Sequence, residues 1–119
     1  LYHIALDRKL SPKLDSYICK LYAKSPDKYL KKISEEACEF ALAIKDLQRF
    51  KLYSNHNKES FGEHIKDNPK YDVIYEAADV LFHMIVALAD YDIHPSAILD
   101  ELKRREGISG IEEKNSRDK

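Results

Sequence analysis

Two pairs of acidic residues have the spacing of side chains that act together on a helix. Glu36 and Glu39 form an E-x-x-E pair, and Glu76 and Asp79 form an E-x-x-D pair in the second half of the chain. Residues three apart are neighbours on one helix face. If the two helices pack antiparallel, the pairs can face each other, and four converging carboxylates would suit a hard divalent ion such as Mg²⁺.

The surroundings of the second pair favour this metal site. The segment 71–102 contains seven carboxylates and no Lys or Arg, so the acids lack local cationic partners. Partly buried carboxylates must then be neutralised, paired or bound to a metal. We expect His83, one turn beyond Asp79, to orient a carboxylate of the site. The alternatives are a hydrated acidic stripe on a buried helix and an interior histidine with satisfied hydrogen bonds.

Basic residues near the acids could serve a phosphorylated substrate. Magnesium held by carboxylates keeps several waters and commonly binds substrate phosphates, whose remaining charge Lys and Arg can hold. Glu35, or whichever carboxylate is not fully committed to the metal, is our candidate for deprotonating an attacking water. The candidate phosphate-binding residues are Lys20, Lys24, Lys32, Arg104 and Arg105. Any one of them could instead be a solvated surface group.

The elements that must position these residues are helices. Only three Gly and four Pro interrupt the 119 residues, and apolar residues recur at steps of three and four. Ser25 is the predicted N-cap of the first long helix, and Gly107 is predicted to end the last helix. We predict helices over 1–10, 13–24, 26 to about 48, 71–91 and 95–105, with a long connection over 49–70 that includes a helical turn near 61–66.

The predicted fold class is all-α: one domain, residues 1–119, forming a multi-helix bundle. The helix 71–91 is apolar around most of its circumference, which predicts that it is buried. Because a chain of this length supports only a modest core, we expect dimerisation to complete the bundle.

Composition excludes several classes of protein. A net charge of −1 argues against nucleic acid as the main partner. The longest apolar run, 80–89, is too short to span a membrane. Cys19 and Cys38 make a poor disulfide framework, which favours a reducing compartment, and we expect a cytoplasmic protein. No Gly-rich phosphate loop and no nucleophile motif supports a covalent mechanism.

Three runs carry a resemblance to a known family: SYICKLYAKSPDKYLKKISEEACE (16–39), YEAADVLFH (75–83) and ELKRREGISGIEEKNSR (101–117). In this order they resemble phosphoribosyl-ATP pyrophosphohydrolase, a helical enzyme of histidine biosynthesis in the all-α NTP pyrophosphohydrolase superfamily. The tail resembles the end of versions fused to phosphoribosyl-AMP cyclohydrolase. Together with the start at Leu1, it suggests the C-terminal domain of such a fusion.

The resemblance implies an activity and a ligand set. The family hydrolyses phosphoribosyl-ATP to phosphoribosyl-AMP and pyrophosphate, and its members assemble as dimers or larger bundles. Carried over by position, the Mg²⁺ ligands are Glu36, Glu39, Glu76 and Asp79. The sequence departs from the family pattern at Ile18, where a threonine is usual, at Ser25, where glycine is common, and in its longer connection.

Two alternative functions remain open at the level of the sequence. The chain could be a house-cleaning (d)NTP pyrophosphatase of the MazG-like group, which an assay of phosphoribosyl-ATP against a dNTP panel would distinguish. It could also be a non-catalytic helical assembly module with an acidic surface. Titration with Mg²⁺ distinguishes this module from the two enzymes, because only the enzymes are expected to bind the metal.

Overall fold

The computed structural model describes residues 1–13, 16–57, 68–108, 110 and 114–115, and the regular structure among them is entirely helical. The helices are α1 (Tyr2–Leu10), α2 (Tyr17–Ala23), α3 (Asp27–Asn57), α4 (Pro69–Asp90) and α5 (Pro95–Glu106). The predicted all-α class is therefore confirmed. None of the helices in these ranges combines the length and apolar character needed to cross a membrane.

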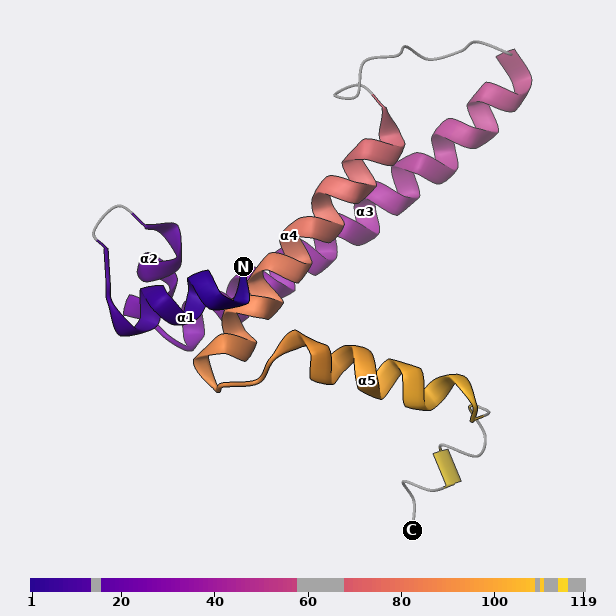
Figure 1. The fold of residues 1–119 in the computed structure, drawn as a ribbon. Coiled ribbons are helices and arrows are strands. Elements are labelled where there is room, and N and C mark those ends of the chain that lie inside the picture. Colours follow the sequence, from indigo (N-terminus) through magenta and orange to yellow (C-terminus); the bar gives the residue numbers. More distant parts are fainter. Residues whose placement is uncertain (14–15, 58–67, 109, 111–113, 116–119) are drawn as a thin grey trace.

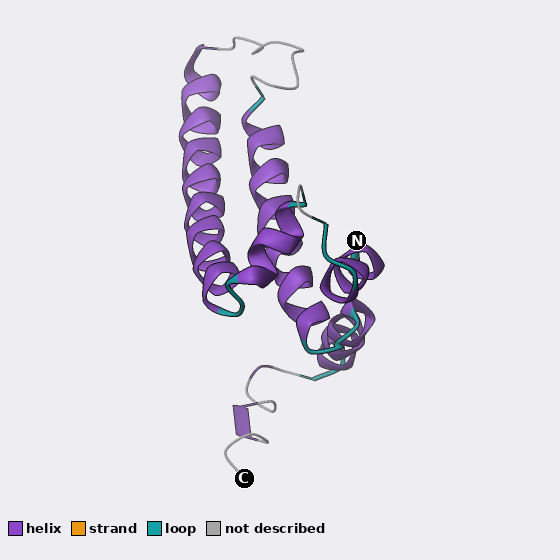
Figure 2. Ribbon diagram, turned by 90° about the vertical axis from the view of Figure 1, so that its left-hand side faces the viewer, coloured by secondary structure: helices purple, strands orange, loops and turns teal. Residues whose placement is uncertain are grey.

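Helices α3 and α4 form a long antiparallel hairpin, and α1 and α2 pack at one end of it (Figures 1 and 2). At that end the start of α3 meets the end of α4. The hydrophobic core lies at this junction and consists of Ala5, Ile18, Leu21, Tyr29, Val86 and Ala89. Burial of apolar surface from four helices therefore holds the start of α3 against the end of α4.

The predicted connection over 49–70 is wrong at its start, because α3 continues to Asn57. Residues 49–57 contain no Gly or Pro, so nothing in the backbone chemistry stops the helix after its apolar periodicity ends. The structure also begins α4 two residues earlier than predicted. Asn68 caps it by accepting a hydrogen bond from the Lys70 amide (2.9 Å), and Pro69 takes the first helical position. The predicted helical turn near 61–66 lies outside the described residues.

The predicted N-cap at Ser25 is also wrong. A capping Ser25 hydroxyl would accept a hydrogen bond from an amide in the first turn, such as that of Lys28. The Lys28 amide instead donates to the main-chain carbonyl of Lys24 at 3.2 Å, and the Leu30 amide donates to that of Pro26 at 3.1 Å. The Ser25 hydroxyl instead donates to Oδ2 of Asp90 at 2.6 Å. A charged acceptor on α4 makes a stronger hydrogen bond than a neutral one, so the hydroxyl joins the start of α3 to the end of α4 rather than capping α3.

Asp90 should make the stability of the chain depend on acidic pH. Its Oδ2 also accepts from the Tyr29 hydroxyl (2.7 Å), and its Oδ1 lies 3.5 Å from Nζ of Lys9. Burial raises the pKa of Asp90, but the hydrogen bonds from Ser25 and Tyr29 and the charge of Lys9 lower it below the usual value overall. The stabilisation is thus present above the unfolded-state pKa of about 4 and is lost as pH falls through the lower folded-state pKa.

We therefore expect the free energy of unfolding to fall more steeply below about pH 4 in the wild-type chain than in Asp90→Asn. Urea denaturation at a series of pH values measures this difference. Asp100→Asn, on exposed α5, is the matched control and should keep the wild-type slope. Parallel pH profiles for the wild-type chain and Asp90→Asn would contradict the assignment.

Helix α4 is not buried on all sides in the single chain, contrary to its apolar pattern. Ile74 and Leu81, two turns apart on one face, are 62% and 56% exposed. Helix α5 leads away from the hairpin (Figure 1), and the exposure of Ile74 and Leu81 shows that no described element covers this face of α4. Gly107 is the C-cap of α5, as predicted, although its φ of −91° is not left-handed.

Candidate metal site

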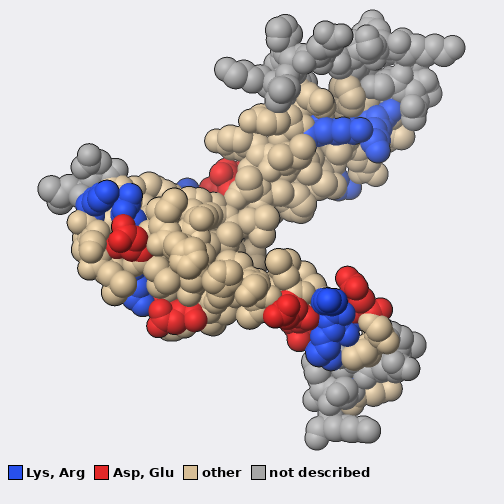
Figure 3. All heavy atoms as spheres, viewed as in Figure 1, with Lys and Arg blue, Asp and Glu red and all other residues tan. Residues whose placement is uncertain are grey.

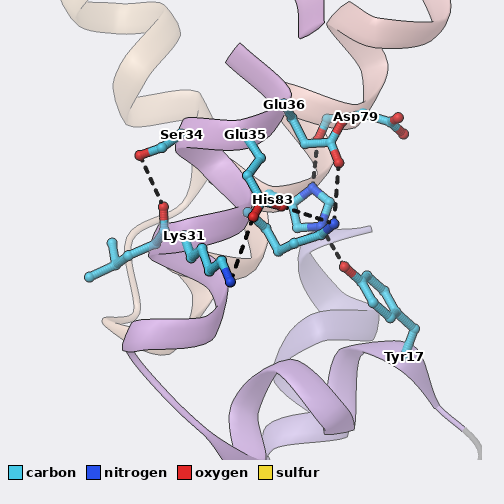
Figure 4. Close-up of polar contacts among 9 residues, drawn as sticks. Tyr17, Lys31, Ser34, Glu35, Glu36, Asp79 and His83 are labelled. Atoms are coloured by element: carbon cyan, nitrogen blue, oxygen red, sulfur yellow. Dashed lines mark hydrogen bonds and ion pairs between the residues drawn. The ribbon is translucent and has the colours of Figure 1, made fainter. Parts of the chain in front are cut away.

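The α3–α4 hairpin brings three of the predicted acids together. One carboxylate oxygen each from Glu36, Glu76 and Asp79 lies within 4.8 Å of the others. Figure 4 shows Glu36 on α3 beside Asp79 on α4. Antiparallel packing achieves this because Glu36 lies early in α3 and the other two acids lie in the middle of α4. We call these three residues the acid cluster.

The acid cluster lacks the donors that buried carboxylates need. The Glu36 side chain is only 9% exposed. One oxygen of Glu36 and one of Glu76, Oε2 in both, are buried without a hydrogen-bond partner among the described residues. Leaving such oxygens unsatisfied costs free energy. A divalent cation would satisfy both, and an all-oxygen ligand set suits Mg²⁺, so the residues present fit the implied metal.

The electrostatics of Asp79 show the same deficit of positive charge. Burial raises the pKa of the Asp79 carboxyl, and the neighbouring Glu36 raises it further. His83 and Lys32 act in the opposite direction but do not cancel the rise. The cluster therefore holds negative charge at a free-energy cost that a bound cation would remove.

Lys31, Lys32 and Glu35 form the rim of the acid cluster. Nζ of Lys32 lies 3.4 Å from Oε2 of Glu35 and 3.6 Å from Oε1 of Glu36. Burial lowers the pKa of Lys32, but Tyr17 and the two glutamates outweigh it, so the net shift is upward. Glu35 is 43% exposed and also lies 3.9 Å from Nζ of Lys31. It is outside the acid cluster, at a place that water can reach.

His83 connects the acid cluster to α2 through a hydrogen-bond chain. Its Nδ1 donates to the main-chain carbonyl of Asp79 at 2.8 Å, so in the neutral ring Nε2 accepts from the Tyr17 hydroxyl, also at 2.8 Å (Figure 4). Neither contact involves a carboxylate side chain, so His83 bonds as a satisfied interior histidine and holds Tyr17. Sequence reasoning missed Tyr17. The one available signal was its place in the SY run at the start of α2.

The pKa of the Tyr17 phenol reflects its position beside the acids. Burial raises this pKa, and the charges of Glu36, Asp79 and Glu35 raise it further, while Lys32 lowers it. The hydroxyl therefore keeps its proton and acts as a hydrogen-bond donor toward His83.

The single chain does not bring the other predicted residues to the acid cluster. Glu39 is exposed and is not part of the cluster, and Lys20 and Lys24 are exposed at α2. Arg104 and Arg105 lie on α5, where they pair with Glu101 at 2.7 and 3.2 Å. Figure 3 shows the basic side chains of this region next to acidic ones, away from the hairpin. The roles of these residues stay predictions.

Comparison with known proteins identifies the family. A family model described as phosphoribosyl-ATP pyrophosphohydrolase matches residues 1–106. The chain belongs to the phosphoribosyl-ATP pyrophosphohydrolase family. The resemblance of the three sequence runs is thus confirmed, and the chain is a member of an enzyme family rather than a non-catalytic helical module.

Relatives of this pyrophosphohydrolase family extend over nearly the whole chain. A phosphoribosyl-ATP pyrophosphatase from Nitrosomonas eutropha is 46% identical over 110 residues, covering 92% of this chain and 76% of the relative. One from Geotalea daltonii is 40% identical over 119 residues, covering 100% and 92%. The histidine biosynthesis bifunctional protein HisIE of Wolinella succinogenes is 43% identical over 117 residues, which are 98% of this chain and 42% of that protein.

Proposed function

We propose that this chain hydrolyses phosphoribosyl-ATP to phosphoribosyl-AMP and pyrophosphate in histidine biosynthesis, in a Mg²⁺-dependent reaction. Membership of the family supports the substrate. The observation that carries the metal dependence is the acid cluster, in which Glu36 and Glu76 each leave one buried carboxylate oxygen without a partner. A cytoplasmic location and a fused cyclohydrolase domain remain predictions. The bifunctional relative supports the second of them.

The acidic residues of the site would have two separate roles, metal binding and proton transfer. Glu36, Glu76 and Asp79 would hold the metal, with Glu39 as the fourth ligand predicted from the family. Magnesium bound there would neutralise the charge that develops on the phosphate oxygens. Glu35, exposed at the rim, would take a proton from a water within hydrogen-bond reach of its carboxylate.

Lysine and arginine side chains would hold the substrate phosphates. Lys32 is the one that already lies at the acid cluster, so it is the first candidate for a phosphate contact. Lys20 and Lys24 would have to reach the phosphates from α2, which already packs at one end of the hairpin, whereas Arg104 and Arg105 would reach them only if substrate binding or assembly brings α5 toward the hairpin. Charge-assisted contacts to phosphate are strong enough to favour such a closure.

A pyrophosphate-release assay tests the proposed function. The chain should release pyrophosphate from phosphoribosyl-ATP in the presence of Mg²⁺, and chelation by EDTA should stop the reaction. A panel of dNTPs measured in parallel tests the MazG-like alternative. Preference for a dNTP, or activity that survives complete metal removal, would refute the proposal.

We also propose that two copies of the chain associate through the exposed face of α4. A soluble monomer rarely leaves a large contiguous apolar patch uncovered, and Ile74, Tyr75 and Leu81 are all more than half exposed here. The chain's small core gives a physical reason for assembly. Association through this face would bury these side chains against a second copy.

Leu81→Asp should therefore weaken self-association. Loss of a buried leucine and burial of an unpaired charge should together raise the dissociation constant by at least about 100-fold. Sedimentation equilibrium measures the constant, with Leu10→Asp, an exposed position on α1, as the control. A monomeric wild-type chain, or equal association of wild type and Leu81→Asp, would overturn the proposal.

A further inference from the structure

Lys32 and a bound metal ion would compete for the carboxylate of Glu36. The ammonium nitrogen of Lys32 lies 3.6 Å from Oε1 of Glu36, the most buried carboxylate of the acid cluster, and 3.4 Å from Oε2 of Glu35. The Lys32 side chain is only one-third exposed, so solvent screens these contacts less than those of a free surface lysine. Among the ion pairs of the described residues, this lysine is the cation that Glu36 contacts.

The neighbouring lysine provides the contrast. Lys31 lies 3.9 Å from Glu35, but its side chain is 78% exposed, and its ion pair does not reach the acid cluster. The two lysines are adjacent on α3 and chemically identical. Only Lys32 therefore has the geometry to act on the carboxylates that would bind the metal.

A lysine and a divalent cation cannot both neutralise Glu36 at no cost. Like charges a few ångströms apart repel, and the repulsion is larger where burial limits screening. The four-carbon stem of lysine lets the ammonium group move several ångströms without any change in the backbone. Metal binding should thus drive the ammonium group away from Glu36 and leave it available for another anion.

We propose that Lys32 is an internal counter-ion of the acid cluster, which Mg²⁺ displaces from Glu36 and which then binds a phosphate of the substrate. This inference rests on the proposed function. Lys32 would stabilise the metal-free cluster and couple metal binding to substrate binding, because the same displacement that admits the metal releases a phosphate ligand. If the two binding steps are coupled in this way, removing the charge of Lys32 should strengthen Mg²⁺ binding and weaken substrate binding.

Isothermal titration of the metal-free chain with MgCl₂, without substrate, tests the first step. Removal of the competing charge in Lys32→Met should tighten Mg²⁺ binding roughly threefold to tenfold. Lys31→Met, the matched control, should change it by less than about twofold. An unchanged or weaker Mg²⁺ affinity in Lys32→Met would overturn the proposal.

Steady-state kinetics at saturating Mg²⁺ test the second step. In Lys32→Met the KM for phosphoribosyl-ATP should rise at least about fivefold, since a charge-assisted phosphate contact is lost. Tighter metal and weaker substrate binding in one variant cannot come from general loosening of the fold, which would weaken both. If both weaken, Lys32 has only a structural role and the proposal fails.

A further variant separates failure of this inference from failure of the metal site. Glu36→Gln should abolish the Mg²⁺ titration signal of the wild-type chain. If the wild-type chain binds no Mg²⁺, or if Glu36→Gln binds it equally well, the metal site itself is refuted. If Glu36→Gln loses binding but Lys32→Met keeps the wild-type affinity, the site stands and only the counter-ion role is refuted.

Discussion

Glu36→Gln is expected to reduce Mg²⁺-dependent release of pyrophosphate from phosphoribosyl-ATP by more than about 100-fold. Removing a group that merely orients a metal ligand typically costs about 10–100-fold in affinity or activity, so removing a ligand itself should cost more. Glu36 is the most buried of the three clustered acids, and glutamine keeps its size while removing its charge.

The same substitution should not destabilise the metal-free chain. Glu36 contributes negative charge to a cluster with two unsatisfied oxygens, so its neutralisation relieves repulsion with Asp79. The substitution also removes the 3.6 Å contact with Lys32, but Lys32 keeps its closer ion pair with Glu35, at 3.4 Å. We expect the melting temperature of Glu36→Gln without metal to equal or exceed that of the wild-type chain. Such a gain in stability with loss of activity is typical of a functional site.

Initial rates and thermal unfolding of the same preparations measure both effects. Asp46→Asn, an exposed acid farther along α3, is the control and should leave both near the wild-type values. Glu39→Gln adds a useful comparison, because it shows whether the family's fourth ligand acts in this chain. Full activity of Glu36→Gln would remove the metal site from the proposed mechanism.

Leu21→Ala is expected to lower the free energy of unfolding by about 2–5 kcal/mol. Leu21 is fully buried in the core where α3 begins and α4 ends, against the cluster that includes Ala5 and Val86. Replacing a buried leucine with alanine removes its transfer free energy and leaves a cavity. Because small domains have only about 5–15 kcal/mol of stability, the loss should be large.

Urea denaturation at one fixed protein concentration measures this loss, since self-association would make stability depend on concentration. Leu10→Ala, an exposed leucine at the end of α1, is the matched control and should change stability by no more than about 0.5 kcal/mol. Equal losses in the two variants would show that the packing around Leu21 does not stabilise the chain.

The sequence predicted the pairing of the two long helices but not every residue of the site. Apolar periodicity on both helices and the E-x-x-D spacing were enough to place Glu36 opposite Glu76 and Asp79. A spacing of three residues, about 300° of helix rotation, brings both Glu76 and Asp79 of α4 into the cluster but leaves Glu39 of α3 exposed and outside it. The spacing alone therefore did not decide which acids converge; the rotation of α3 against α4 did.

Other contacts depend on tertiary geometry that no local pattern encodes. The hydroxyl of Tyr17 reaches His83 across 66 positions of the chain. Ser25 has the local pattern of a helix cap, yet it bonds to Asp90 because the fold places a charged acceptor within reach. Hydrophobic periodicity reports which face of a helix packs, but it does not say which polar group another helix will offer there.

The bonds that join Ser25 and Tyr29 to Asp90 have a mechanical consequence for the metal site. Asp79 lies eleven residues before Asp90 on α4, a distance of roughly 16 Å along the helix axis. These bonds hold α3 and α4 together about three helical turns from Asp79, at the end where α3 begins and α4 ends. A change in the crossing angle of the two helices there would alter the separation of Glu36 from Asp79, so residues that contact no ion can still tune the space in which one would fit.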